Sequence, residues 1–152
     1  MKDAATIRPG EPDDLRVHGL ELLDEHYDEL CVDKGALRLD PAWDRYESLI
    51  ASGAMFALCV WIGSELIGYS ACLVQPHLHY RRSIWAYNDV LFVRKQHRRG
   101  TIGVRLIKAT EEEAAKRGAN VMAWHAKEGT ALQEILPSMS YRLQETIYTR
   151  NL

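Results

Sequence analysis

The sequence is poor in the features that mark secreted and membrane-spanning proteins. It has three cysteines, Cys31, Cys59 and Cys72, and the last two lie in apolar, strand-like runs. An odd number of such residues predicts reduced core thiols in a cytoplasmic protein rather than a disulfide framework. No apolar run approaches the roughly 20 residues that a membrane-spanning helix needs, and no signal-peptide pattern opens the chain. We therefore expect no contact with a membrane.

The histidines do not form a metal-binding pattern. His77 and His79 are two residues apart in an expected loop, but no cysteine or carboxylate follows at the spacing of metal ligands. We interpret both as surface or aromatic-packed loop residues and predict no metal cofactor.

Charge and composition are ordinary overall but unevenly distributed. The chain is 47% hydrophobic and 26% charged, and it has no repeats or linkers, which predicts one soluble domain spanning residues 1–152. The net charge of -2 combines -7 in residues 1–50 with +5 in the remainder. The basic part suits a polyanionic cofactor and the acidic part a cationic acceptor, although solvated helix faces explain the acids equally well.

Hydrophobic periodicity predicts an α/β (α+β) fold with one mixed, mostly antiparallel sheet. Strand-like patterns cover residues 6–9, 55–62, 66–74, 85–93, 121–125 and 141–148. Helical patterns cover residues 13–31, 40–52, 101–117 and a short segment from 130. Because a helix connects them, strands 85–93 and 121–125 are expected to be parallel.

Capping residues set the expected ends of these helices. Asp40 and Pro41 form an N-cap and first-turn pair, and Gly118 follows the third helix as a stop. Thr130 and Gln133 form a capping-box candidate for the last helix, which Pro137 is expected to end.

The stretch from Asn88 to Lys108 combines a buried strand, a basic turn and a helix. Residues 90–93 are uncharged and suit a strand buried on both faces. The turn holds several Arg and Lys residues, and Gly100 and Gly103 let backbone come close to a ligand. A helix N-terminus offers free N–H groups, so this order predicts a phosphate cradle. Glycines before a helix are also common in plain loops, but the coincidence of all three features favours the cradle.

At these residues the sequence resembles the GNAT (Gcn5-related) N-acetyltransferases. Their acetyl-CoA pyrophosphate loop reads Arg or Gln, two residues, Gly, one residue, then Gly or Ala, and it aligns with Arg98-Arg99-Gly100-Thr101-Ile102-Gly103. Thr101 then replaces the first motif glycine; the alternative register, with Gly100 at that position, puts Ile102 at the second. The segments PAWDRYESL, PHLHYR, DVLFV, HRRG and SYRLQETIYTRNL look most like GNAT-type proteins of phages and prophages.

The resemblance implies a sheet with two splayed central strands, flanked by about four helices, and acetyl-CoA as co-substrate. The strands that should part to admit the pantetheine arm are 85–93 and 121–125. The resemblance also implies that the pantetheine arm pairs with the backbone of Leu91, Phe92 and Val93. The pyrophosphate would lie on the loop and helix start, at Arg98, Arg99, Gly100, Thr101, Ile102, Gly103 and Val104.

Acetyl transfer to an amine needs a base, and Asp89 is the first candidate. It precedes the buried run, at a position resembling that of the carboxylate many GNAT enzymes use, and burial is expected to raise its pKa. A strand-end Asp bonded to backbone is the structural alternative.

The proton donor of the family is missing. Counting back from Ser140-Tyr141, which stand for the usual Gly-Phe, Leu136 occupies the place of the expected Tyr, and Gly129 lies near that of the expected Asn. Substitutes are His125, Tyr141 and Tyr87, each of which is more often structural than catalytic. Water or positioning alone could also suffice.

Three functions remain open. The first is an N-acyltransferase acting on a small-molecule or protein amine. The second is a CoA-binding GNAT-like phage protein with little catalysis. The third is a nucleic-acid-binding module, which the acidic remainder and the lack of interleaved aromatics disfavour. We expect a cytoplasmic protein, of a bacterial host if phage-encoded, with no nucleic-acid or membrane partner; a homodimer stays open.

Overall fold

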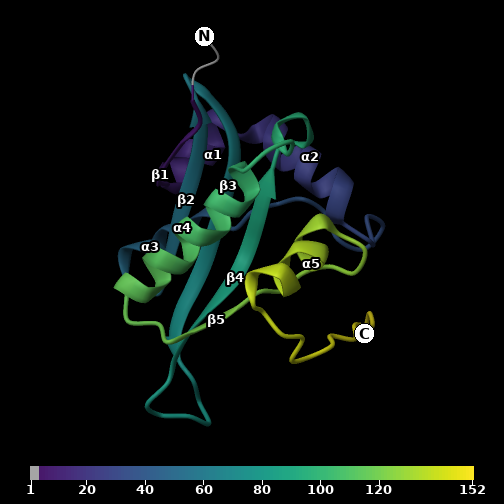
Figure 1. Ribbon diagram of the computed structural model, residues 1–152. Helices are drawn as coiled ribbons and strands as arrows, with labels where there is room; N and C mark the ends of the chain where they lie inside the picture. Colours follow the sequence, from purple (N-terminus) through teal and green to yellow (C-terminus); the bar gives the residue numbers. More distant parts are fainter. Residues whose placement is uncertain (1–3) are drawn as a thin grey trace.

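The computed structural model describes residues 4–152, which form one five-stranded mixed sheet (Figure 1). The strands β1 (Thr6–Pro9), β2 (Met55–Ile62), β3 (Glu65–Pro76), β4 (Ile84–Val93) and β5 (Val121–Ala123) lie side by side in this order. β1 to β4 are antiparallel, and β5 is parallel to β4. The predicted fold class and the parallel crossover are confirmed.

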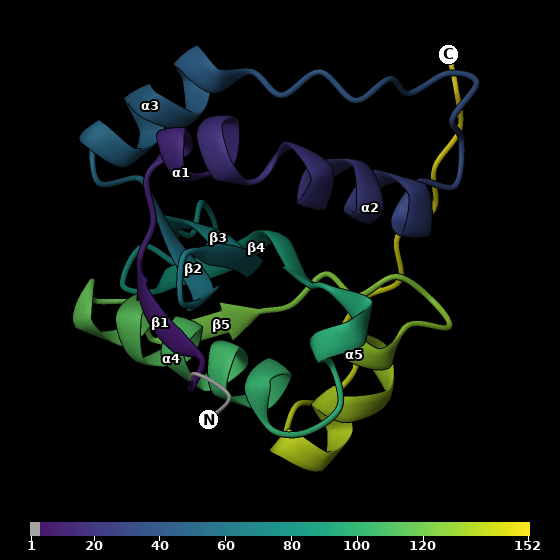
Figure 2. The same ribbon diagram turned by 90° about the horizontal axis from the view of Figure 1, so that it is seen from above.

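Five α-helices are found in residues 4–152: α1 (Pro12–His18), α2 (Leu20–Leu30), α3 (Trp43–Ala51), α4 (Ile102–Lys116) and α5 (Ala131–Ile135). α1, α2 and α3 lie on one face of the sheet and α4 on the other (Figure 2). Short 3₁₀ helices cover Lys95–His97 and Leu136–Met139. Within residues 4–152, no helix is long and apolar enough to cross a membrane.

The sheet separates two apolar clusters. Under α4, side chains of β2 to β4 pack against Leu106 and Ala114, and Thr110 donates to Ser70 Oγ at 3.0 Å. Under α2, Leu22 packs with Trp61, Leu66, Tyr69 and Phe92. Both polar groups of the Thr110–Ser70 pair are thus satisfied inside the core, as burial requires.

The single helix predicted over residues 13–31 is divided in two at Gly19. A Cβ at Gly19 would lie 2.8 Å from Leu15 Cδ2 and 3.0 Å from Leu66 Cδ2. The chain therefore turns where only glycine lets the backbone approach β3 so closely. This turn adds one helix to the number expected.

The predicted N-cap of α3 is wrong. α3 begins at Trp43 with Ala42 at its N-cap, so Asp40 does not cap it. α5 ends at Ile135, and the chain continues through Pro137 as a 3₁₀ helix. The α-helix thus ends before Pro137, as predicted, and Pro137 lies in the first turn of the 3₁₀ helix, where its missing N–H is harmless.

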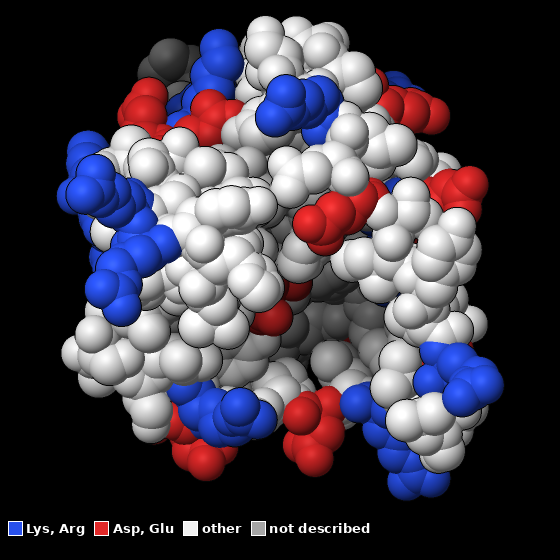
Figure 3. Space-filling model, turned by 90° about the horizontal axis from the view of Figure 1, so that it is seen from below, with Lys and Arg blue, Asp and Glu red and all other residues white. Residues whose placement is uncertain are grey.

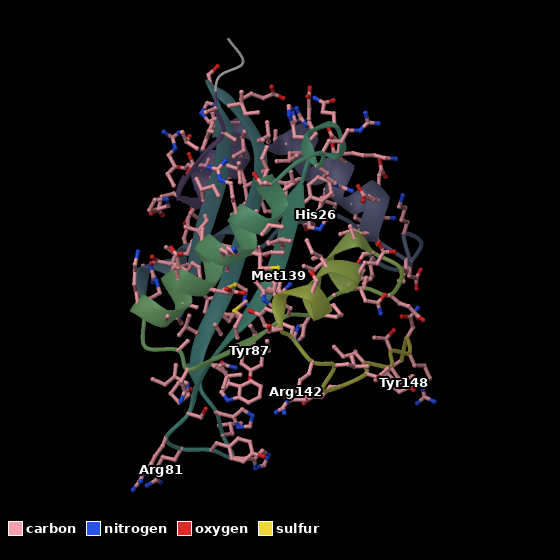
Figure 4. All side chains as sticks on the ribbon, in the orientation of Figure 1. His26, Arg81, Tyr87, Met139, Arg142 and Tyr148 are labelled. Carbon is pink, nitrogen blue, oxygen red and sulfur yellow. The ribbon has the colours of Figure 1, made fainter. Side chains whose placement is uncertain are left out.

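The strand predicted over residues 141–148 does not form. The chain beyond Ser140 has no secondary structure, and Arg142 and Tyr148 lie along a segment that runs away from the sheet (Figure 4). Leu143, Ile147 and Tyr148 are all exposed. Alternating polarity makes a strand only where a neighbouring edge pairs with it, and this segment finds none.

Candidate active site

A bulge in β4 directs Asp89 out of the sheet ladder. Ala71 pairs with Val90 and Cys72 with Asn88, so Asp89 has no partner in β3. The extra residue turns Asp89 and Val90 towards the same face of the sheet, because a bulge places two residues of one strand opposite a single residue of its partner. Val90 packs under α2, and Asp89 Oδ2 accepts a 2.5 Å hydrogen bond from the Tyr46 hydroxyl of α3.

Asp89 is exposed, so the burial expected from the sequence is not found. Its partner Tyr46 is half-buried, and burial followed by the Asp89 carboxylate raises the pKa of Tyr46 above its ordinary value. The tyrosine therefore stays a neutral donor that orients the carboxylate.

β4 and β5 part directly beside Asp89. Their ladder ends at the pair of Tyr87 and Ala123. Beyond this pair, the buried Asn88 side chain bonds to the chain after β5 in place of strand backbone. Asn88 Oδ1 accepts from the His125 N–H at 2.5 Å, and Asn88 Nδ2 donates to the His125 carbonyl at 3.4 Å. Asn88 therefore fixes the point at which the two strands separate.

The edge of β4 beyond this point has no strand partner in residues 4–152. The Arg94 N–H donates to Ile67 in β3, so strand alternation aims the backbone groups of Phe92 at β3 as well. The groups of Leu91 and Val93 then face the open edge, where Arg98 Nε binds the Val93 carbonyl at 2.7 Å. The open edge is thus available at Leu91 and at the Val93 N–H, but not at Phe92.

The start of α4 presents free amides. Thr101 is the N-cap without a side-chain cap, and the first intrahelical bond recorded runs from the Arg105 N–H to the Thr101 carbonyl. The amides of Ile102, Gly103 and Val104 precede it and therefore have no intrahelical acceptor. A Cβ at Gly103 would meet no atom within 4 Å outside the backbone of its own helix, so the side of the helix at Gly103 is open. Gly100 has φ of +119°, which a side chain would disfavour.

The two arginines of the turn have different surroundings. Arg98 forms a double salt bridge with Glu29 of α2, at 2.5 and 2.6 Å, and its guanidinium lies 5.0 Å from the Phe92 ring centre. Arg98 therefore connects α2 to the end of β4. Arg99 is the more exposed of the two and forms no salt bridge within residues 4–152; both arginines line a surface pocket with Lys95 and Gln96.

The candidate proton donors do not converge on Asp89 as a group. His125 is exposed at the end of β5, with its ring 6.1 Å from that of Tyr87. Tyr141 donates to Glu111 of α4 at 2.6 Å, and burial followed by Glu111 raises its pKa. Leu136, at the place of the expected Tyr, is buried. His77 packs against Tyr80 and Trp85, as expected for an aromatic-packed loop.

His26 is a half-buried histidine that the sequence interpretation missed. It stacks on Phe92 at 4.7 Å, and its Nδ1 lies 2.5 Å from the Tyr69 hydroxyl. Burial, and then the charge of Lys127, lower the pKa of His26 to about 4, so its ring is neutral at pH 7. Its place on the apolar face of α2, with Leu22 and Leu30, was the signal that could have identified it.

A cavity of about 340 Å³ lies on the same face of the sheet. Its walls are formed by α2, α3 and the segment 31–42. It is also lined by Val90, Tyr46 and Lys127, and it therefore lies next to Asp89 and the parted strands. Figure 3 shows a hollow in the face seen from below, with uncharged side chains and several acidic ones at its rim. The site thus combines a carboxylate, an open strand edge, free amides and a cavity.

This arrangement agrees with the family comparison, in which residues 21–134 match the Acetyltransferase (GNAT) family. The chain belongs to the GNAT family. No curated protein sequence matches it significantly. Proteins of the GNAT family generally use acetyl-CoA.

Several solved structures share the GNAT fold of this protein. A GCN5-related N-acetyltransferase from Ralstonia eutropha JMP134 is 24% identical, with a TM-score of 0.73 over 97% of this chain and 99% of its own. An aminoglycoside acetyltransferase from an uncultured soil metagenomic sample is 20% identical, with a TM-score of 0.75 over 98% and 99%. A ribosomal-protein-alanine N-acetyltransferase from Brucella melitensis biovar Abortus 2308 is 17% identical, with a TM-score of 0.74 over 98% and 99%. These identities establish the fold and leave the acceptor open.

Proposed function

We propose that this GNAT protein is an acetyl-CoA-dependent N-acetyltransferase acting on a primary amine. The observation that carries the proposal is the proximity in the chain of two free backbone surfaces, the open edge of β4 and the amides that start α4. Leu91 and the Val93 N–H would hold the pantetheine arm. The amides of Ile102, Gly103 and Val104 would hold the pyrophosphate, with Arg99 adding positive charge from the loop.

Asp89 serves as the base. An amine reaches the site as an ammonium ion, and Asp89 takes its proton directly or through water, held in place by the Tyr46 hydroxyl. The freed nitrogen attacks the thioester carbonyl, the C–N bond forms and the C–S bond breaks. The proton lost by the attacking nitrogen neutralises the departing thiolate.

We infer that this second proton travels through water or exposed His125. His26 remains neutral because its pKa is about 4, and Tyr141 already donates to Glu111. A thiolate is a tolerable leaving group, so alignment of amine and thioester can supply much of the rate.

A CoA-binding protein with little turnover is the second candidate. The buried Leu136, at the place where the family resemblance sets a tyrosine, favours it. A single domain, a cytoplasmic location and a homodimer remain proposals. A phage or prophage origin rests on the likeness of short segments alone.

Two measurements test the function. The first is calorimetric titration with acetyl-CoA, and the second is thiol release from acetyl-CoA in the presence of primary amines. The variant Gly103→Val fills the open side of the helix at Gly103, so we expect its affinity for acetyl-CoA to fall at least tenfold. Gly35→Val is the matched control, because Gly35 lies on an exposed loop with no atom closer than 3.7 Å to its Cβ. Equal affinity of both variants would remove the assigned site, and absence of binding to the wild type would remove the function.

A further inference from the structure

The cavity beside Asp89 is lined mainly by carbon. Leu23 and Leu30 come from α2, Leu39 from the segment 31–42, and Trp43 and Ile50 from α3. Its volume of about 340 Å³ lies within the range of roughly 300–1,000 Å³ usual for small-molecule sites. Such walls favour an apolar group, because a polar group placed there would lose its hydrogen bonds to water.

The few charged side chains of the cavity balance one another. Glu11 and Asp40 are acidic, and Arg38 and Lys127 are basic. A ligand with several positive charges therefore meets no surplus of negative charge within the lining. One carboxylate outside the lining is within reach of a single ammonium group, because Asp89 precedes Val90 in β4 and accepts a hydrogen bond from Tyr46, and both of these residues line the cavity.

We propose that the acceptor is a small primary amine bearing a single aliphatic or aromatic group. Its apolar group occupies the cavity, and its nitrogen lies at Asp89. This inference rests on the proposed function and specifies its substrate class. It separates this protein from an enzyme for polycationic, hydroxyl-rich acceptors, whose polar groups would face the leucine side chains.

A matched panel of amines tests the inference by thiol release from acetyl-CoA. Tryptamine, phenethylamine and hexylamine represent the proposed class, and ethanolamine, spermidine, an aminoglycoside and a short peptide with an apolar first residue represent its rivals. We expect kcat/KM for the apolar amines to exceed that for ethanolamine by at least about thirtyfold, the gain expected from burying one such group.

A charged substitution in the cavity wall provides the structural control. Leu39→Asp places a carboxylate among the apolar groups, and we expect the KM for tryptamine to rise at least tenfold while the KM for acetyl-CoA stays the same. Val32→Asp changes the same segment at a residue that is 87% exposed and does not line the cavity, and it should leave both KM values unchanged.

The outcomes separate the inference from the proposed function. Acetyl-CoA binding with preference for spermidine, the aminoglycoside or the peptide overturns the substrate class and leaves the function standing. Equal effects of Leu39→Asp and Val32→Asp on the tryptamine KM also overturn it. Absence of acetyl-CoA binding in the calorimeter overturns both. Preference for the apolar amines, lost in Leu39→Asp alone, supports the inference.

Discussion

At the residue scale, the account depends on Asp89, which lies at a bulge and not at an ordinary strand position. Its carboxylate is exposed and accepts a hydrogen bond from Tyr46. In the proposed mechanism Asp89 would therefore act through its position beside the parted strands and not through a pKa raised by burial.

Replacing the base should lower the rate without affecting the co-substrate. We expect Asp89→Asn to reduce kcat roughly a hundredfold or more, because asparagine keeps the shape and loses the proton acceptor. The dissociation constant for acetyl-CoA should not change. Full turnover of the variant with the preferred amine would make Asp89 a structural residue.

His26 should make stability depend on pH. Its pKa is about 4 in the folded protein and near 6.5 when unfolded, so between these values the unfolded chain binds the extra proton. The contribution of His26 to the free energy of unfolding is therefore fully present above pH 6.5 and declines as the pH falls towards 4. The free energy of unfolding, measured with urea, should fall by about 2 kcal/mol between pH 7 and pH 5 because of this residue.

Two variants isolate that contribution. His26→Gln should have a smaller difference in unfolding free energy between pH 7 and pH 5 than the wild type, by about the same 2 kcal/mol. His79→Gln, at an exposed histidine of the β3–β4 loop, should keep the wild-type difference. An unchanged difference in His26→Gln would show that another group causes the pH dependence.

At the scale of elements, strands and helices with a complete local pattern were predictable. β2, β3, β4 and α4 were predicted within a few residues because each buries a continuous apolar face. The break at Gly19 was not, since it depends on contact with Leu66, which is distant in sequence. The last strand failed for the same reason: local alternation does not say whether an edge is free to pair with it.

The end of α5 provides a test of packing. Leu136 is 8% exposed, so we expect Leu136→Tyr to destabilise the protein by about 1–3 kcal/mol by overpacking. Glu134→Tyr, at an exposed position of α5, is the control and should have little effect. Thermal or urea unfolding measures both. A fully stable Leu136→Tyr protein would show that this helix end has room for the larger ring.

At the scale of the whole molecule, the strand, turn and helix start around Gly100 and Gly103 were predictable from the sequence, and the cavity was not. Gly100, Gly103 and the helix start lie within a few residues of one another, so their arrangement is a local property. His26, Tyr46 and Asn88 come from α2, α3 and β4 and meet only in the folded chain. The cavity is built from such distant segments, which explains why the sequence pointed to a cofactor and to no acceptor.

The central claim is that the free amides of α4 and the open edge of β4 bind one acetyl-CoA. Backbone amide NMR spectra recorded during an acetyl-CoA titration test it most directly. We predict the largest chemical-shift changes at Ile102, Gly103 and Val104, with further changes at Leu91 and Val93. Saturable binding that leaves these five amide signals unmoved would contradict the account.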